Sequence, residues 1–129
     1  MKLFASEKCW EFKFRHPDVF NSYGCGPGGI GDWLVPDTIY GLSIKPACQI
    51  HDWYYRFQRG DSEEDRKKAD KIFLTNMLQI VNERGNFLIK KLRRRRAKTY
   101  YKAVRWLGAA AYFSERSTKE QFKEFVTTL

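Results

Sequence analysis

Apolar residues recur at intervals of three and four positions through the middle of the chain. Those that share this spacing between positions 62 and 82 are Ala69, Ile72, Phe73, Met77 and Ile80. The spacing predicts an amphipathic helix that runs to about Asn82 and ends near Gly85. Before it, the segment RGDSEED supplies a stop at Gly60 and an N-cap at Asp61 or Ser62 followed by acidic residues, which is typical of a helix start.

Another helix is predicted just before this one and another after it. Pro46 suits the first turn of a helix that continues to about Gln58. A further helical pattern covers about Ala97 to Phe113, and STKE at Ser117–Glu120 is a capping box that opens a short final helix. The first 43 residues are rich in Gly, Pro and aromatic residues, a composition typical of loops with room for a short helix. Strand patterns are almost absent, so we expect a mainly α-helical fold.

Length and charge narrow the classes of protein. A chain of 129 residues fits one domain, residues 1–129, with little room for a second core. No apolar run approaches the length of a membrane-spanning helix, and charged residues interrupt the start of the chain where a signal peptide needs an apolar segment. The formal net charge of +9 attracts anionic partners without choosing between nucleic acid and an anionic lipid surface. The densest basic run, KKLRRRRAK at 90–98, is interpreted as a solvated helix end or loop.

Aromatic side chains gather at four places, around Trp10, Trp33, Trp53 and Trp106. Tryptophan packs well in protein cores and also at the headgroup boundary of a membrane, so both interpretations remain. In the group around Trp53, two tyrosines follow directly in the sequence.

Two polar residues fall where the helical pattern places buried side chains. Asp70 is in register with Phe73 on the later helix, and His51 is in line with Tyr55 on the earlier one. The turn at Gly60 lies nine residues after His51 and ten before Asp70. Antiparallel packing, with a rise of about 1.5 Å per residue, therefore brings the two side chains level. His51 can then donate one ring proton to Asp70 and keep its other nitrogen as a base, although a purely structural histidine fits the same spacing.

Asp52 and a glycine-rich segment suggest a calcium site. Asp52 follows His51 directly and points about 100° away around the helix, so it needs a different partner. Four glycines fall within YGCGPGG at 23–29. Glycines let the carbonyl groups of a short loop turn inward, and calcium binds carboxylate and carbonyl oxygens together. Asp52 is the single clear carboxylate ligand, unless Asp32 or Asp37 also contributes.

The cysteines argue against a zinc site. Cys9, Cys25 and Cys48 allow at most one internal disulfide and leave one thiol over. They lie too far apart for paired zinc ligands, and the chain has only two histidines to help them. The second histidine, His16, lies in the loop-like segment FRHPD, where we expect a surface position.

Several spaced segments resemble the phospholipase A2 superfamily. CGPGG at 25–29 and ACQIHDWYY at 47–55 are similar to its calcium loop and His-Asp helix. ADKIFLTNM at 69–77 and TYYKAV at 99–104 most resemble the small bacterial and fungal branch, and the GPG segment with a downstream Asp is also similar to the viral capsid version. The resemblance implies a mainly α-helical, phospholipase A2-like fold. In that fold two antiparallel core helices carry a His/Asp dyad, a Gly-rich calcium loop precedes them, and one or two helices follow.

The resemblance also implies residue roles. His51 resembles the catalytic base, Asp70 the acid that orients it, and Tyr55 the helix tyrosine near that acid. Asp65 is the alternative to Asp70, which we favour because it lies on the apolar face and level with His51. The ligands implied for Ca²⁺ are the Asp52 carboxylate and the carbonyl groups of Gly24, Gly26 and Gly28. A Cys25–Cys48 disulfide is implied between loop and helix.

The implied activity is calcium-dependent hydrolysis of the sn-2 ester of glycerophospholipids. His51 takes a proton from the attacking water, while calcium and a loop amide stabilise the oxyanion. The implied partner is a phospholipid membrane surface, anionic because the chain is basic. With one clear carboxylate the calcium affinity should be weak, at about 0.1–1 mM. We therefore expect a chain made in the cytoplasm to act only after lysis or delivery, as phage- or toxin-associated relatives do.

Three alternatives remain. A catalytically silent phospholipase A2-like module would keep the fold and bind a membrane or a protein. A nucleic-acid-binding protein, which we favour less, would use the arginines at 93–96. A nucleotide-binding protein is suggested by Gly24, Gly26 and Gly29, which fit G-x-G-x-x-G, but no buried strand precedes them.

Overall fold

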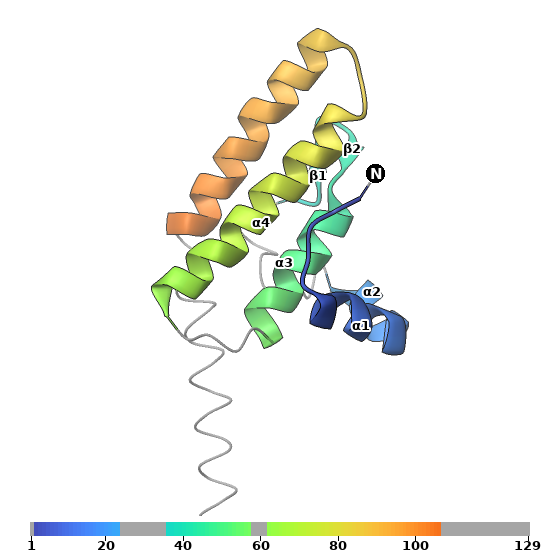
Figure 1. Cartoon of the computed structure of the whole chain (residues 1–129). Helices are drawn as coiled ribbons and strands as arrows, with labels where there is room; N and C mark the ends of the chain where they lie inside the picture. Colours follow the sequence, from blue (N-terminus) through green and yellow to red (C-terminus); the bar gives the residue numbers. More distant parts are fainter. Residues whose placement is uncertain (1, 24–35, 58–61, 107–129) are drawn as a thin grey trace, which may run out of the picture.

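The computed structural model describes residues 2–23, 36–57 and 62–106, and this part of the chain is mainly α-helical (Figure 1). The elements in chain order are α1 (Glu7–Arg15), α2 (Pro17–Ser22), β1 (Thr38–Ile39), β2 (Leu42–Ser43), α3 (Lys45–Phe57), α4 (Glu63–Asn82) and a helix over residues 87–106. None of the described helices has both the length and the apolar character that crossing a bilayer requires.

The core lies between three long helices, with α4 in the middle (Figure 1). α3 runs antiparallel to α4 on one side, and the helix over residues 87–106 runs antiparallel to it on the other (Figure 1). Side chains of all three pack into one apolar cluster, which includes Ala47, Phe73, Met77, Val81, Ala97 and Val104. The two antiparallel core helices expected from the sequence are therefore confirmed, at nearly the predicted bounds. Gln58, the predicted end of the first, lies outside the described residues.

The start of α4 confirms the predicted cap. The Ser62 hydroxyl accepts a hydrogen bond from the Asp65 backbone N–H at 3.1 Å and donates one to the Asp65 carboxylate at 2.8 Å. These bonds satisfy a backbone group that has no partner inside the helix. Gly85, with φ of +95°, follows the other end of α4 in the left-handed conformation that favours glycine. Asp65 thus acts as a capping residue and does not contact His51.

The N-terminal region differs from the prediction of loops with room for a short helix, because it contains two helices. Ser6 caps α1, its hydroxyl accepting from the Cys9 N–H at 3.3 Å, and Pro17 occupies the first turn of α2. Both helices are short and depend on packing more than on periodicity. They form a second apolar cluster against α3, which includes Cys9, Phe20, Tyr23, Trp53, Tyr54 and Tyr55. The aromatic group at 53–55 is therefore part of the core and not a membrane boundary.

The third long helix begins ten residues earlier than predicted. The Asn86 side chain accepts a hydrogen bond from the Ile89 N–H at 3.0 Å, which caps a helix that starts at residue 87. The basic run at 90–98 therefore lies inside this helix and is neither its end nor a loop. Lys and Arg are good helix formers, so a charged run of this kind does not break a helix. The predicted end at Phe113 and the final short helix lie outside the described residues.

β1 and β2 form a small antiparallel hairpin directly before α3. Thr38 pairs with Ser43 and Ile39 with Leu42, and the turn residues Tyr40 and Gly41 both have positive φ, as a two-residue hairpin turn requires. The Tyr100 hydroxyl donates to the Thr38 carbonyl at 3.0 Å. This hydrogen bond ties the hairpin to the helix over residues 87–106.

A buried amide fixes the start of the chain to α4. Asn76 has no exposed surface, and its side chain accepts from the Phe4 N–H at 2.6 Å and donates to the Phe4 carbonyl at 2.9 Å. The Asn76 side chain thus satisfies both the N–H and the carbonyl group of Phe4. The apolar pattern did not reveal Asn76 as a core residue.

We expect Asn76→Ala to destabilise the protein by about 2 kcal/mol, because Phe4 loses both partners for its backbone groups. Urea unfolding measures this change. The matched control is Thr75→Ala, since Thr75 is exposed and bonds only within its own helix. Equal stability of the two variants would show that Asn76 does not anchor the N-terminal segment.

Candidate functional site

His51 of α3 and Asp70 of α4 form a buried pair. His51 Nε2 lies 2.8 Å from Asp70 Oδ1, and the two residues are 5% and 0% exposed. The separation along the chain is 19 residues, so the contact depends on the antiparallel packing of α3 and α4. The predicted level placement of the two side chains is confirmed.

Tyr55 and Phe73 hold the imidazole in one orientation. The Tyr55 hydroxyl donates to the same Asp70 oxygen at 2.6 Å, and its ring centroid lies 4.3 Å from that of His51. Phe73 stacks on the imidazole with centroids 4.5 Å apart. Among the described residues nothing hydrogen-bonds to His51 Nδ1. With the proton on Nε2, this second nitrogen carries a lone pair and can accept a proton.

The other Asp70 oxygen contacts two arginines that the sequence interpretation missed. Oδ2 accepts from Arg105 Nη1 at 2.8 Å and from Arg66 Nη1 at 3.3 Å. Glu63 pairs with both arginines, at 2.7 Å from Arg66 and 2.5 Å from Arg105. Arg66 also donates to the carbonyl groups of Val104 and Arg105, at 2.9 and 2.8 Å. The dyad therefore belongs to a network that spans α3, α4 and the helix over residues 87–106.

One of these arginines had a signal in the sequence. Arg66 lies three residues after Glu63 and four before Asp70, spacings at which charged side chains meet on a helix. Arg105 is 35 residues from Asp70 and comes from a different helix, so no local spacing indicates it.

The network sets the charge state of its members. Burial acts to raise the pKa of Asp70, but hydrogen bonding and charge from His51, with hydrogen bonds from Tyr55 and Arg105, outweigh it and hold the pKa below its ordinary value of 3.8. Burial and the Asp70 charge raise the pKa of Tyr55 well above its ordinary value. Asp70 is therefore an anion at neutral pH, and Tyr55 is a hydrogen-bond donor.

The expected calcium site is only partly within the described residues. Asp52 is 2% exposed, and its Oδ1 accepts from Arg56 Nε at 3.1 Å. The expected ligands Gly24, Gly26 and Gly28 lie outside the described residues, and so does Cys25, the expected partner of Cys48. Within residues 2–23, 36–57 and 62–106, no three His, Cys, Asp or Glu side chains gather to hold a metal ion. The ligand set stays a prediction.

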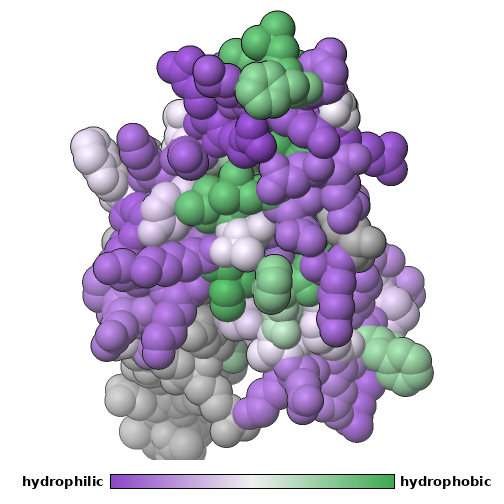
Figure 2. Space-filling model, turned by 45° about the horizontal axis from the view of Figure 1, so that its top comes forward, coloured by the Kyte–Doolittle hydropathy of each residue, from purple (hydrophilic) through white to green (hydrophobic). Residues whose placement is uncertain are grey.

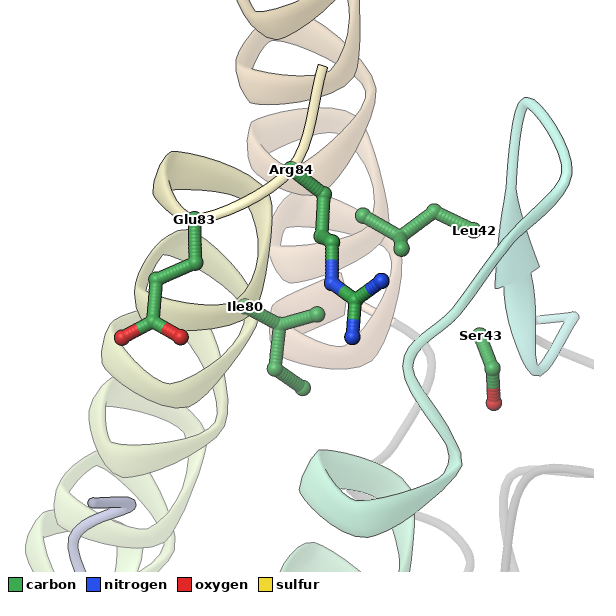
Figure 3. A pocket seen from close by; sticks show the side chains of 5 residues that line it. All are labelled: Leu42, Ser43, Ile80, Glu83 and Arg84. Carbon is green, nitrogen blue, oxygen red and sulfur yellow. The ribbon is translucent and has the colours of Figure 1, made fainter. Parts of the chain in front are cut away.

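A separate hollow lies at the C-terminal end of α4 (Figure 3). It encloses about 500 Å³ between α4 and the hairpin and is lined by Leu42, Ser43, Ile80, Glu83 and Arg84. Ile80 is ten residues beyond Asp70, or about 15 Å along the helix. This hollow contains no dyad residue, so it is not the site of the His51 chemistry.

Comparison of the chain with family models, with curated proteins and with solved structures finds no match.

We expect Arg66→Met to lower the free energy of unfolding by about 3 kcal/mol, because Arg105 alone then remains as the guanidinium partner of both the buried Asp70 carboxylate and Glu63. The effect is measured by urea unfolding at neutral pH. Lys67→Met, at the neighbouring exposed position, is the matched control and should change stability by less than about 0.5 kcal/mol. A similar loss in both variants would contradict a specific role for the Arg66 contacts.

Acid should remove the stabilisation due to the Asp70 carboxylate. The pKa of Asp70 is lower in the folded protein than its ordinary value of 3.8, so this contribution is fully present above that pH and falls as the pH drops through the folded-state value. We expect the difference in unfolding free energy between wild type and Asp70→Asn to be constant from pH 7 to about pH 5 and to shrink below about pH 4. Urea unfolding across this range tests it, and a difference that persists unchanged at low pH would contradict it.

Proposed function

We propose that this chain is a calcium-dependent phospholipase A2 that hydrolyses the sn-2 ester of glycerophospholipids. The observation that carries the proposal is the buried hydrogen bond of 2.8 Å between His51 Nε2 and Asp70. It leaves Nδ1 without a hydrogen bond among the described residues, as the base of such an enzyme requires. The motifs around the dyad, described above, supply the substrate class.

Each residue of the dyad region has a role in this reaction. His51 Nδ1 removes a proton from the water that attacks the ester carbonyl. Asp70 accepts a hydrogen bond from His51 Nε2–H and stabilises the imidazolium as it forms. The Tyr55 hydroxyl donates to the Asp70 carboxylate and fixes it in place. The chain has no G-x-S-x-G segment, so a serine nucleophile on an elbow of that type is not part of the mechanism.

Asp52 would hold Ca²⁺ together with the carbonyl groups of Gly24, Gly26 and Gly28. A buried carboxylate suits a calcium ion, which prefers oxygen ligands. The bound ion would supply positive charge that stabilises the substrate phosphate and the developing oxyanion. Arg56 already pairs with Asp52, so its guanidinium must share the carboxylate or turn away.

The Asp52–Arg56 pair also favours a second candidate function, the catalytically silent module. A guanidinium at 3.1 Å already supplies the positive charge that a cation would bring to Asp52. Such a module would keep the His51–Asp70 pair as a structural contact and bind a membrane or a protein without turnover. The two candidates differ in whether phospholipid is hydrolysed.

Activity is tested by the release of fatty acid from mixed phospholipid vesicles. We expect His51→Asn to lower the rate by about 100-fold or more, because it removes the general base. The matched control is His16→Asn, at an exposed histidine 35 residues earlier, which should keep wild-type activity. No release by the wild-type chain at millimolar calcium would support the silent module instead.

Calcium dependence is tested in the same assay. We expect a chelator to abolish release and half-maximal activity to require about 0.1–1 mM Ca²⁺, because Asp52 is the one clear carboxylate ligand. An enzyme with this affinity would be inactive in a resting cytoplasm and act after lysis or delivery, as in a phage- or toxin-associated protein. A submicromolar half-point would exclude that form of control.

A further inference from the structure

The helix over residues 87–106 carries the whole net charge of the protein. It contains nine Lys and Arg residues and no acidic residue, and the chain as a whole has a formal net charge of +9. Acidic and basic residues are therefore equal in number over the rest of the sequence. Arg105 pairs with Asp70 and Glu63, but no other basic residue of this helix pairs with a carboxylate among the described residues.

One side of this helix faces away from the core. Leu88 and Trp106 are 18 residues apart, which is five helical turns, so they lie on one line along the helix. Ala97 is nine residues from each, on the opposite side, and it is fully buried. We call the exposed side the outer face. It comprises Leu88, Lys91, Leu92, Arg95, Thr99, Lys102 and Trp106.

The outer face combines large apolar side chains with basic ones. Leu88 is 65% exposed and Trp106 85%, and Leu92 lies between them along the same line. Lys91, Arg95 and Lys102 run along one edge of this apolar line. On the side of the molecule that lies at the top of Figure 1, hydrophobic side chains also gather among strongly hydrophilic ones (Figure 2).

Two hollows open on the outer face. One encloses about 410 Å³ and is lined by Tyr40, Leu92, Arg95, Arg96 and Thr99. There Arg96 lies over the Tyr40 ring, 5.1 Å from its centroid, and donates to the Tyr40 hydroxyl at 2.8 Å. The other is apolar and is lined by Thr99, Lys102, Ala103 and Trp106. The face thus offers cationic groups beside recesses that side chains or acyl chains can enter.

We propose that the outer face docks onto the surface of an anionic phospholipid bilayer. Leu88, Leu92 and Trp106 enter the boundary between headgroups and acyl chains, and the basic side chains beside them contact lipid phosphates. A helix with apolar residues on one line and Lys and Arg along its flank has the character of an interfacial helix. Charge alone would also suit nucleic acid, but exposed leucines gain nothing from a phosphate backbone, whereas a bilayer buries them.

The helix over residues 87–106 also contacts the dyad directly. Arg105, next to Trp106 in the sequence, contacts Asp70 Oδ2 at 2.8 Å. The end of the outer face therefore lies one residue from the His51–Asp70 network. The choice of a phospholipid as partner rests in part on the proposed phospholipase function, but the charge and exposure of the outer face do not.

The test is sedimentation with vesicles at about 0.15 M salt, in a His51→Asn background so that lipid is not hydrolysed. Vesicles of phosphatidylcholine alone are compared with vesicles that also contain phosphatidylglycerol. We expect binding only to the anionic vesicles, and the triple variant Lys91→Gln, Arg95→Gln, Lys102→Gln should weaken it on the order of 100-fold. The double variant Leu88→Gln, Leu92→Gln should weaken it by about tenfold or more.

Matched controls separate the outer face from general charge and hydrophobicity. Lys67→Gln, Lys68→Gln, Lys71→Gln changes the net charge equally at exposed positions of α4. Phe14→Gln removes a more exposed apolar side chain, 87% exposed, from α1. Both controls should stay within about threefold of the parent, because the α4 charges are screened beyond a Debye length and Phe14 lies outside the outer face.

Three results would overturn the proposal: equal losses in outer-face and control variants, equal binding to both vesicle types, or tighter binding to an RNA oligonucleotide than to anionic vesicles at the same salt. The readout is independent of hydrolysis. Docking without turnover by the wild type would therefore count against the phospholipase function alone, and turnover with unaltered docking in the variants would count against the outer face alone.

Discussion

The Asp70 carboxylate is shielded from water and accepts hydrogen bonds from four side chains on three helices. His51 and Tyr55 come from α3, Arg66 from α4, and Arg105 from the helix over residues 87–106. A buried carboxylate is tolerated only when it is paired and its oxygens are hydrogen-bonded. The three helices must therefore keep the relative positions that bring these donors together, so the contact that makes the dyad also fixes the arrangement of the core.

The side chains around Asp70 keep its carboxyl group ionised. The two carboxylates, Asp70 and Glu63, pair with the two guanidinium groups of Arg66 and Arg105, so these four side chains balance in formal charge. The hydrogen bonds on Oδ1 orient the imidazole, and His51 contributes most to keeping the pKa of the Asp70 carboxyl group low, with further hydrogen bonds from Tyr55 and Arg105. A structural role for the network and a chemical role for His51 are therefore compatible.

Two of the core helices and the contact between them could be predicted from the sequence, because they depend on the spacing of residues along the chain. α4 follows from its apolar spacing and α3 from Pro46 in its first turn. The level placement of His51 and Asp70 follows from their nearly equal distances to Gly60, nine and ten residues. The start of α1 and the helix start at residue 87 each depend on one capping side chain, Ser6 and Asn86, and α2 begins at Pro17 without a side-chain cap. Apolar periodicity gives no weight to such residues. Arg66 lies four residues before Asp70 on the same helix, so this contact could have been predicted from the sequence. Arg105 depends on tertiary packing between distant segments and could not be predicted in this way.

The helix over residues 87–106 contributes Arg105 to the buried network on one side and forms the exposed outer face on another. Arg105 turns toward Asp70, while Leu88 and Trp106 lie opposite Ala97, on the side away from α4. Neighbours in a helix point about 100° apart, so one helix can present an inward guanidinium and an outward apolar line at the same end. The outer-face side chains make no contact with Asp70 or His51 among the described residues. Changes there should alter attraction to a surface while the dyad keeps its geometry, which makes the two properties separable by experiment.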